Sequence, residues 1–222
     1  RVATLSKLIR FPTQINIIIT TVNAISQRVP PRYVIKDSSI FLKIGNSINT
    51  DEFKNSLIQI GYQSASSVIN KGDFAVRGGI IDVFPPNLAL PVRFDFFGDQ
   101  IDRARMFDPI TQLSEGAITE VLLCPVSEFF LNDLHINCFR SKYRHTFGAN
   151  GLNDPLYEAV SAGRSYLGYE HWGPLFYEKM ETLLDYFSSD TTITMDHRVD
   201  EAILQRSDVI NEQFNNRNAD IN

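Results

Sequence analysis

The sequence lacks an excess of basic residues. Its 222 residues include 21 Lys and Arg against 26 Asp and Glu, which gives a formal net charge of −5 and a pI near 5.4. A surface that binds duplex DNA usually carries a basic stripe that neutralises phosphates, and no such stripe is visible. Nucleic acid is therefore a poor first candidate for a direct partner, and we expect at most weak, salt-sensitive DNA binding.

Cysteine and long apolar runs are also scarce. The two cysteines, Cys124 and Cys138, are too few for a disulfide framework, so we expect a reducing, cytoplasmic compartment. The best apolar run, residues 15–19, falls far short of the roughly 20 residues that a membrane helix needs, and no signal peptide opens the chain, so we expect no membrane partner. The chain begins at Arg1 inside an amphipathic pattern and ends in a polar tail, and we interpret both ends as cuts in a longer protein.

Motifs that carry catalysis are missing as well. The sequence contains no GxxxxGK[ST], so the loop and lysine that cradle nucleotide phosphates are absent and we expect neither ATP nor GTP hydrolysis. It contains no HExxH, GxSxG or CxxC either. Four possible metal ligands have spacings that match no zinc pattern, so we expect no metal or other cofactor; they are Cys124, His135, Cys138 and His145. Four acids in the strand-rich region are expected at solvated strand or turn positions rather than in a catalytic cleft; they are Asp82, Asp95, Asp99 and Asp102.

The chain does contain clear patterns for both helices and strands. The β-branched run over residues 15–20 predicts a buried strand, and residues 21–29 can follow as a short helix. Thr50 and Asn153 are expected helix caps, with Gly61 and Gly163 at the exits. Further helices are predicted over 132–147 and 197–214. Short strands are expected at 74–77, 80–84 and 92–97, with Gly98-Asp99 as a hairpin turn.

These elements divide the chain into three segments. A truncated α/β piece runs to about residue 38, a strand-rich unit covers 39–125, and a mostly helical remainder covers 126–222. Pro125, directly after an apolar run, is a reasonable boundary. The sequence therefore predicts an α/β protein in which the middle unit has its own small core.

One strand has a face that does not fit a core. The segment 92–97 alternates with period two, so Val92, Phe94 and Phe96 form the core face. The other face carries Arg93, Asp95 and Phe97, and Arg77 on a neighbouring strand could join it. An outward phenylalanine beside an arginine is typical of an interaction hot spot, although a lone exposed phenylalanine is also common. A strict two-residue hairpin would place Arg103 opposite Phe94, so a bulge or longer loop is expected.

The segment 166–177 is dense in aromatic residues. Such a run could form a binding platform. More often, a loop of this composition folds back and anchors in the core, and we expect that outcome here.

Two runs of the strand-rich unit resemble a signature shared by UvrB and the transcription-repair coupling factors, the Mfd family. The first is Gly72-Asp73-Phe74-Ala75-Val76-Arg77-Gly78-Gly79-Ile80-Ile81-Asp82-Val83-Phe84-Pro85. The second is Pro91-Val92-Arg93-Phe94-Asp95-Phe96-Phe97-Gly98-Asp99-Gln100-Ile101-Asp102, followed by Phe107-Asp108-Pro109-Ile110-Thr111-Gln112. The segments 21–29 and 170–176 are similar to Mfd sequences on either side, which favours Mfd over UvrB.

The resemblance implies the UvrB-homology module of that family. Residues 1–38 and 126–222 would belong to a degenerate ATPase-like domain, and 39–125 would be an inserted domain that binds UvrA. The UvrA-binding positions map onto Arg77, Arg93 and Phe97, with Asp95 on the same face. Leu113 departs from the arginine that is more common in the family, which would weaken a peripheral charge contact.

The same resemblance sets the expected partners. The module would recruit nucleotide excision repair to RNA polymerase stalled at DNA damage, without catalysis of its own. RNA polymerase and DNA would be bound through domains outside this chain, and the C-terminal domain would cover the UvrA-binding face at rest. The alternatives are a nucleic-acid-binding module of a UvrB-like repair protein, which the acidic balance disfavours, and a nucleotide hydrolase, which the missing phosphate loop disfavours.

Overall fold

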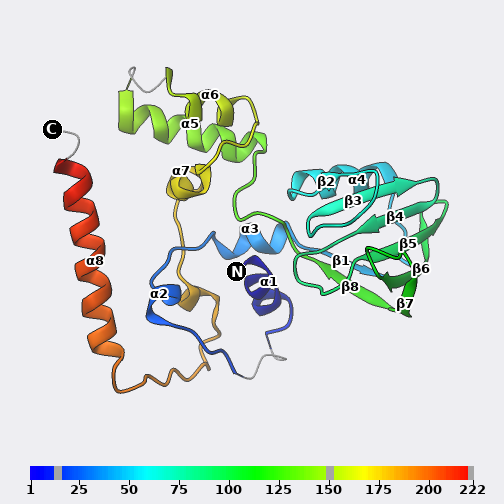
Figure 1. The fold of residues 1–222 in the computed structure, drawn as a ribbon, viewed down its shortest axis with the longest axis horizontal. Coiled ribbons are helices and arrows are strands. Elements are labelled where there is room, and N and C mark those ends of the chain that lie inside the picture. The colour runs from blue at the N-terminus through cyan, green and yellow to red at the C-terminus, as the bar shows by residue number, and fades with distance from the viewer. Residues whose placement is uncertain (13–16, 149–152, 220–222) are drawn as a thin grey trace.

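The computed structural model describes residues 1–12, 17–148 and 153–219. It has mixed α/β architecture, as predicted, with the strand-rich part on one side of the molecule and helices on the other (Figure 1). The strands are β1 (Ile40–Lys43), β2 (Gln63–Ser64), β3 (Asp73–Arg77), β4 (Ile80–Val83), β5 (Val92–Phe97), β6 (Gln100–Phe107), β7 (Ser114–Ala117) and β8 (Glu120–Leu123). The helices are α1 (Val2–Arg10), α2 (Val22–Ile25), α3 (Arg32–Asp37), α4 (Thr50–Gln59), α5 (Asp133–Phe147), α6 (Pro155–Ser161), η2 (Tyr169–Trp172), α7 (Gly173–Phe176), η3 (Leu183–Tyr186) and α8 (Val199–Ala219).

Six strands form one sheet in the order β2-β3-β4-β5-β6-β7. Only β2 and β3 are parallel, and every other neighbouring pair in this sheet is antiparallel. The predicted strands at 74–77, 80–84 and 92–97 are thus confirmed as β3, β4 and β5. A separate antiparallel pair, β1 with β8, joins residues 40–43 to 120–123, so the chain enters and leaves the strand-rich part at one place.

Helix α4 lies on one face of the sheet and supplies much of its core. The Phe53 ring meets the Phe94 ring edge-on at 6.1 Å and the Phe96 ring at 6.2 Å. Phe53 and Phe94 are buried, and Phe96 is only partly buried against the same cluster. Burial of a side chain of this size typically stabilises a fold by about 1.5–3 kcal/mol. This packing fixes which face of the sheet is left outside.

Two helix caps lie one residue from their predicted positions. Asn49, not Thr50, caps α4, because its side chain accepts hydrogen bonds from the amides of Asp51 and Glu52. Asp154, not Asn153, caps α6 by accepting from the Leu156 amide. In both places two cap-forming residues are adjacent, and composition alone does not decide which one starts the helix.

The strand predicted over residues 15–20 is wrong in its described part. Residues 15 and 16 lie outside the described residues, and residues 17–20 form no strand. Ile17 and Ile19 are exposed, and Ile18 packs partly against a small cluster that contains Leu5 and Tyr186. A strand needs a neighbour for its backbone hydrogen bonds, and none of the described strands pairs with this segment.

Helices α6 and α7 pack against α5, which begins after the Asn132 cap and ends at Phe147, as predicted for residues 132–147. The expectation that the aromatic segment anchors in the core is confirmed for its end, because Phe176 and Tyr177 are buried. Tyr166 and Leu167 at its start are exposed. The predicted long helix near the end is α8, which stands apart from the sheet in Figure 1. No helix among the described residues is long and apolar enough to cross a lipid bilayer.

His135 on α5 should make stability depend on pH. Its ring is buried against Phe130 and Tyr177, with ring centroids at 5.9 and 5.0 Å, and burial lowers its pKa. The folded chain therefore binds this proton less readily than the unfolded chain, so this contribution to stability is present above the unfolded pKa of about 6.5 and is lost as the pH falls below it. We expect the melting temperature to fall between about pH 7 and pH 5, and to fall less in His135→Phe, which keeps an aromatic ring. Equal pH dependence in both proteins would contradict this assignment.

Candidate protein-interaction face

The side of the six-stranded sheet away from α4 is called here the polar face. Strand register assigns residues to it, because directly paired residues point to the same side of a sheet. It carries Ala75, Arg77, Ile80, Asp82, Arg93, Asp95, Phe97, Gln100, Arg103 and Arg105. The predicted interaction residues Arg77, Arg93, Asp95 and Phe97 thus lie on one face, as the period-two pattern indicated.

The expected irregularity in the β5–β6 hairpin is present. Phe97 pairs with Gln100 and Phe96 with Ile101, whereas Asp95 pairs with Arg103, so Asp102 is an extra residue in β6. This bulge lets Ala104, rather than an arginine, lie opposite Phe94 in the core. Phe94 is 1% exposed and Phe97 is 84% exposed, which confirms the predicted inward and outward positions.

The tip of this hairpin is held firmly. Gly98 has φ +60°, which suits the first central position of a two-residue turn of type II′. The segment before α4 runs beside the tip and binds it through backbone hydrogen bonds, from the Ile48 amide to the Asp99 carbonyl at 2.7 Å and from the Ile101 amide to the Asn46 carbonyl at 3.0 Å. Phe97 is therefore displayed by a rigid turn.

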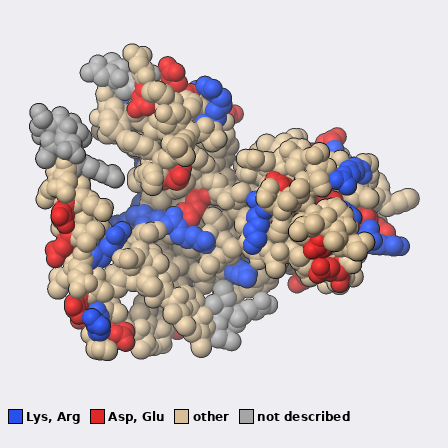
Figure 2. All heavy atoms as spheres, viewed as in Figure 1, with Lys and Arg blue, Asp and Glu red and all other residues tan. Residues whose placement is uncertain are grey.

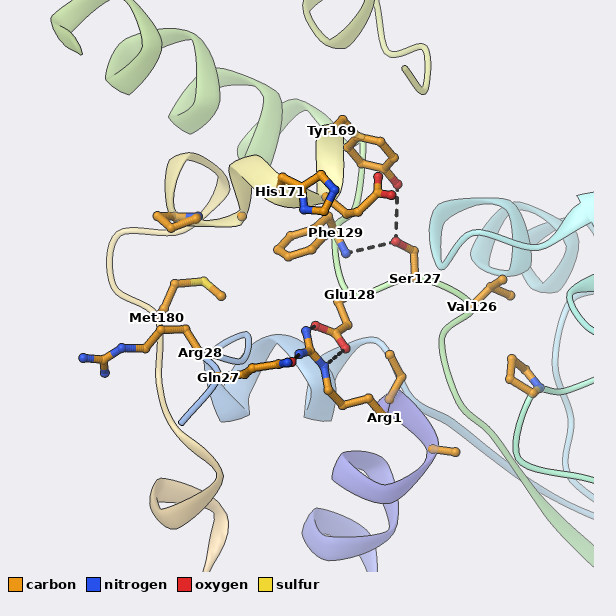
Figure 3. Close-up of a pocket in the computed structure, with 16 residues that line it drawn as sticks. Arg1, Gln27, Arg28, Val126, Ser127, Glu128, Phe129, Tyr169, His171 and Met180 are labelled. Carbon is orange, nitrogen blue, oxygen red and sulfur yellow. Dashed lines mark hydrogen bonds and ion pairs between the residues drawn. The ribbon is translucent and has the colours of Figure 1, made fainter. Parts of the chain in front are cut away.

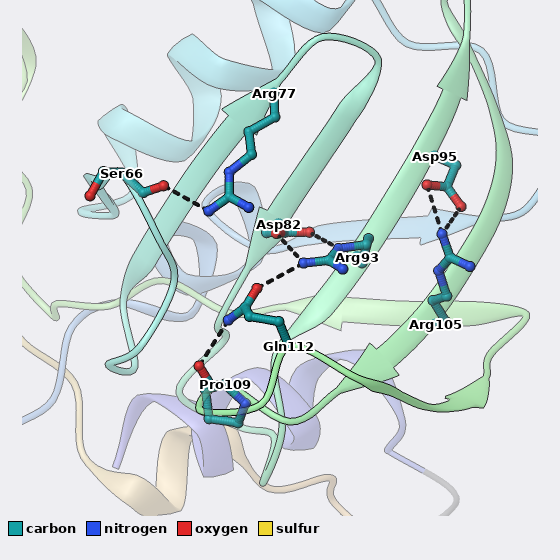
Figure 4. A network of polar contacts seen from close by, with 8 residues as sticks. All are labelled: Ser66, Arg77, Asp82, Arg93, Asp95, Arg105, Pro109 and Gln112. Carbon is teal, nitrogen blue, oxygen red and sulfur yellow. Dashed lines mark hydrogen bonds and ion pairs between the residues drawn. The ribbon is translucent and has the colours of Figure 1, made fainter.

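Arg93 is not the freely accessible side chain that the sequence predicted. Its guanidinium donates two hydrogen bonds to the Asp82 carboxylate, at 2.7 and 2.8 Å, and a third to Oε1 of Gln112 at 3.0 Å (Figure 4). It also lies 4.4 Å above the centre of the Phe107 ring. Only 15% of the side chain is exposed. The ion pair with Asp82 raises the pKa of Arg93, so the residue is a fixed cation built into the sheet.

The prediction of solvated acids is wrong for Asp82 and incomplete for Asp95. Asp82 is buried, because it pairs with Arg93 on the next strand and lies beside the small cluster of Val68, Ala75 and Phe107. A buried carboxylate is stable only when it is paired. Asp95 is partly buried and accepts two hydrogen bonds from Arg105, at 2.8 and 3.1 Å (Figure 4).

Two arginines on β6 extend the face beyond the residues that the sequence indicated. Arg103 and Arg105 follow the bulge and point to the same side as Arg93 and Asp95. Arg103 is 73% exposed and forms an ion pair, at 3.3 Å, with the adjacent Asp102. The sequence shows that the two arginines are two residues apart and so lie on one side of a strand. Which side they face depends on the position of the bulge, and the structure fixes that position by pairing Phe94 with Ala104.

Arg77 lies at the exposed end of β3, in the same row across the sheet as Ile80, Asp95 and Arg103. Its guanidinium donates to the Ser66 carbonyl at 2.8 Å (Figure 4). Arg77 as a whole is exposed. Arg77 and Arg103 are therefore the most available cations of the polar face.

Charges of both signs lie close together over the strand-rich part in Figure 2. On the polar face, the charges of Asp82 and Arg93 cancel within one ion pair, and those of Asp95 and Arg105 cancel within another. The face thus offers a few separate cations around an exposed aromatic ring, rather than the basic stripe that tracks a nucleic-acid backbone.

A second feature is a depression of about 820 Å³ between α1, the segment after β8 and η2 (Figure 3). Arg1 in its lining pairs with Glu128 and also donates to Gln27. Ser127 shares a hydrogen bond of 3.3 Å with the Tyr169 hydroxyl and accepts from the Phe129 amide. These polar groups of the lining thus bind one another. Among the described residues, no group of three His, Cys, Asp or Glu side chains could hold a metal ion.

Comparison with known proteins finds a family match that covers the strand-rich part. Residues 40–129 match the model of the family described as the UvrB interaction domain. The transcription-repair-coupling factor of Haemophilus influenzae is 36% identical over 177 residues, which cover 79% of this chain and 15% of that protein. The corresponding proteins of Escherichia coli and Rickettsia prowazekii are 35% and 34% identical, over 85% and 96% of this chain and 17% and 19% of their own lengths. The chain thus spans less than a fifth of the length of these curated relatives.

Proposed function

Since the chain belongs to the family of transcription-repair-coupling factors, of which it spans one segment, we propose that it binds the repair protein UvrA through the polar face. The observation that carries this proposal is Phe97, which is 84% exposed at the tip of a rigid hairpin. The match to an interaction-domain family over residues 40–129 supports it. In the longer protein, this binding would bring nucleotide excision repair to RNA polymerase stalled at DNA damage.

Phe97 serves as the apolar anchor of the contact. An aromatic side chain that becomes fully desolvated in a partner's pocket often dominates the binding energy of an interface. Because the turn is pinned by the segment before α4, little conformational entropy is lost when the ring is captured. The neighbouring charges then set orientation and the rate of encounter.

Arg77 and Arg103 supply those charges. Arg93 and Arg105 are occupied by Asp82 and Asp95, whereas Arg77 and Arg103 retain donors for a partner. An arginine fork binds a carboxylate through two parallel hydrogen bonds. The face therefore fits a protein surface with an apolar pocket and flanking acidic side chains.

The proposed role of this segment is non-catalytic. Its sequence lacks a phosphate-binding loop, and the polar face is built for contact rather than for proton transfer. The rest of the longer protein would supply motor activity and bind RNA polymerase and DNA. Its C-terminal domain would cover the UvrA-binding face.

Replacing Arg77 or Arg103 by alanine should slow association with UvrA. We expect each change to lower the association rate about three- to tenfold at low ionic strength and to reduce its dependence on salt, because exposed charges steer encounter and are screened. Stopped-flow mixing at several salt concentrations measures this effect. Arg164→Ala is the matched control, since Arg164 is exposed in the helical part. Equal rates for all four proteins would reject the two arginines as contact residues.

The proposal is tested by titrating the chain separately with UvrA, a short DNA duplex and ATP. We expect saturable binding to UvrA, no tight binding of DNA at physiological salt and no ATP turnover. Sub-micromolar binding of DNA without binding of UvrA would favour the nucleic-acid module instead.

A further inference from the structure

The connection between β6 and β7, residues 108–113, exposes two aliphatic side chains. Ile110 is 85% exposed and Leu113 is 69% exposed. Single exposed apolar residues are ordinary on protein surfaces. Two of them on one short loop beside the proposed interaction face are less ordinary, because neighbouring exposed apolar groups commonly mark contact sites.

This loop is rigid. The Asp108 carboxylate accepts from the amides of Ile110 and Thr111, at 2.9 and 2.6 Å, and from the Thr111 hydroxyl at 3.0 Å. The Asp108 amide donates to the Leu113 carbonyl at 2.9 Å, and the Gln112 amide donates to the Asp108 carbonyl at 2.8 Å. The ends of the loop are thereby closed on each other. A loop that is already ordered loses little entropy when it binds.

Gln112 connects the loop to the sheet. Its backbone has φ +62°, a conformation that is uncommon for a residue other than glycine. Its side chain donates to the Pro109 carbonyl at 2.8 Å and accepts from Arg93 at 3.0 Å (Figure 4). Arg93 is in turn fixed by the buried Asp82. The chain of contacts from Asp82 through Arg93 to Gln112 therefore sets the position of the loop.

The loop continues the polar face at the end away from Phe97. Arg93 and Phe97 lie on the same face of β5, four residues apart, which corresponds to about 13 Å along the strand. A partner of ordinary size covers about 800 Å² on each side of an interface, enough to reach both the hairpin tip and the loop.

From these contacts we infer that residues 108–113 form a second apolar contact for the same partner, with Ile110 and Leu113 as the touching side chains and Arg93 as a positioning residue that acts through Gln112. This inference rests on the proposed function. It also gives Arg93 a role, because Nε and Nη2 of its guanidinium are already bonded to Asp82 and Gln112. The partner surface would carry two apolar pockets separated by acidic side chains.

The test is titration of UvrA with five proteins: the wild type, Phe97→Ala, the double variant Ile110→Ser/Leu113→Ser, Gln112→Gly and Leu167→Ser. Gln112→Gly removes the side chain that contacts Arg93, and glycine adopts the positive φ without strain. A loss of affinity in this variant therefore reflects the lost contact with Arg93 rather than a strained backbone. Leu167→Ser is the control, since Leu167 is 96% exposed in the helical part. We expect the double variant to lose about tenfold or more in affinity, Gln112→Gly to lose less, and the control to bind like the wild type.

The outcomes separate this inference from the proposed function. Loss of binding in Phe97→Ala with full binding by the double variant would overturn the second contact and leave the first. Wild-type binding by all variants would reject both. Sedimentation of the free chain measures whether it self-associates. If the double variant abolished self-association but bound UvrA normally, the loop would be a contact between two copies of this chain, and the inference would be overturned. Melting curves should agree among wild type, double variant and control, because the changed side chains are exposed.

Discussion

Replacing Arg93 by alanine should lower the free energy of unfolding by about 3 kcal/mol, because it leaves a buried carboxylate without its partner. Asp82 is 2% exposed, and both of its oxygens accept hydrogen bonds from Arg93. Loss of the guanidinium also removes its contacts with Gln112 and the Phe107 ring. Such a loss is much larger than the change in unfolding free energy expected for an arginine that points into solvent. Chemical denaturation of the purified chain measures it.

A double-mutant cycle identifies the cause. Asp82→Ala alone should also destabilise the chain, and the double variant Arg93→Ala/Asp82→Ala should cost clearly less than the sum of the two single changes, because the pair is then removed together. Arg103→Ala is the matched control, since this side chain is 73% exposed. An Arg93→Ala change within about 0.5 kcal/mol of the wild type, the range typical of surface sites, would show that the ion pair does not hold the sheet.

The sequence was sufficient for features that depend on local pattern. Period two along β5 predicted Phe94 inside and Phe97 outside, and the conflict between Arg103 and Phe94 predicted the bulge. Cap-forming residues located α4 and α6 to within one residue. These predictions succeed because side-chain direction in a strand and capping at a helix start are set by residues next to each other in the chain.

Features that depend on distant partners could not be predicted in the same way. The environment of Arg93 requires Asp82 from a neighbouring strand and Gln112 from a later loop, and only the register of the sheet brings them together. The β-branched run at 15–20 has the composition of a strand, but its described part has no strand to pair with. The proposed partner comes from resemblance to a family, because an exposed aromatic ring indicates contact without specifying what is contacted.

Replacing Phe97 by alanine should weaken binding to UvrA by about thirtyfold, which corresponds to the roughly 2 kcal/mol typical of a hot-spot truncation. The ring is 84% exposed in the free chain, so its removal should change the free energy of unfolding by less than about 0.5 kcal/mol. Most of the loss should appear as faster dissociation, since a desolvated aromatic anchor holds the formed complex together. Arg93→Ala should instead lower both the affinity for UvrA and the free energy of unfolding. This difference distinguishes a residue that contacts the partner, Phe97, from one that holds the sheet and loop in position, Arg93.

Isothermal titration of UvrA with wild type, Phe97→Ala and Leu167→Ala tests most directly whether the chain binds UvrA through Phe97. Leu167 matches Phe97 in exposure but lies in the helical part, so it controls for loss of any exposed apolar side chain. We expect tight binding by the wild type and by Leu167→Ala, and about thirtyfold weaker binding by Phe97→Ala with an unchanged melting curve. Equal affinity of all three proteins for UvrA, or no binding by the wild type, would contradict it.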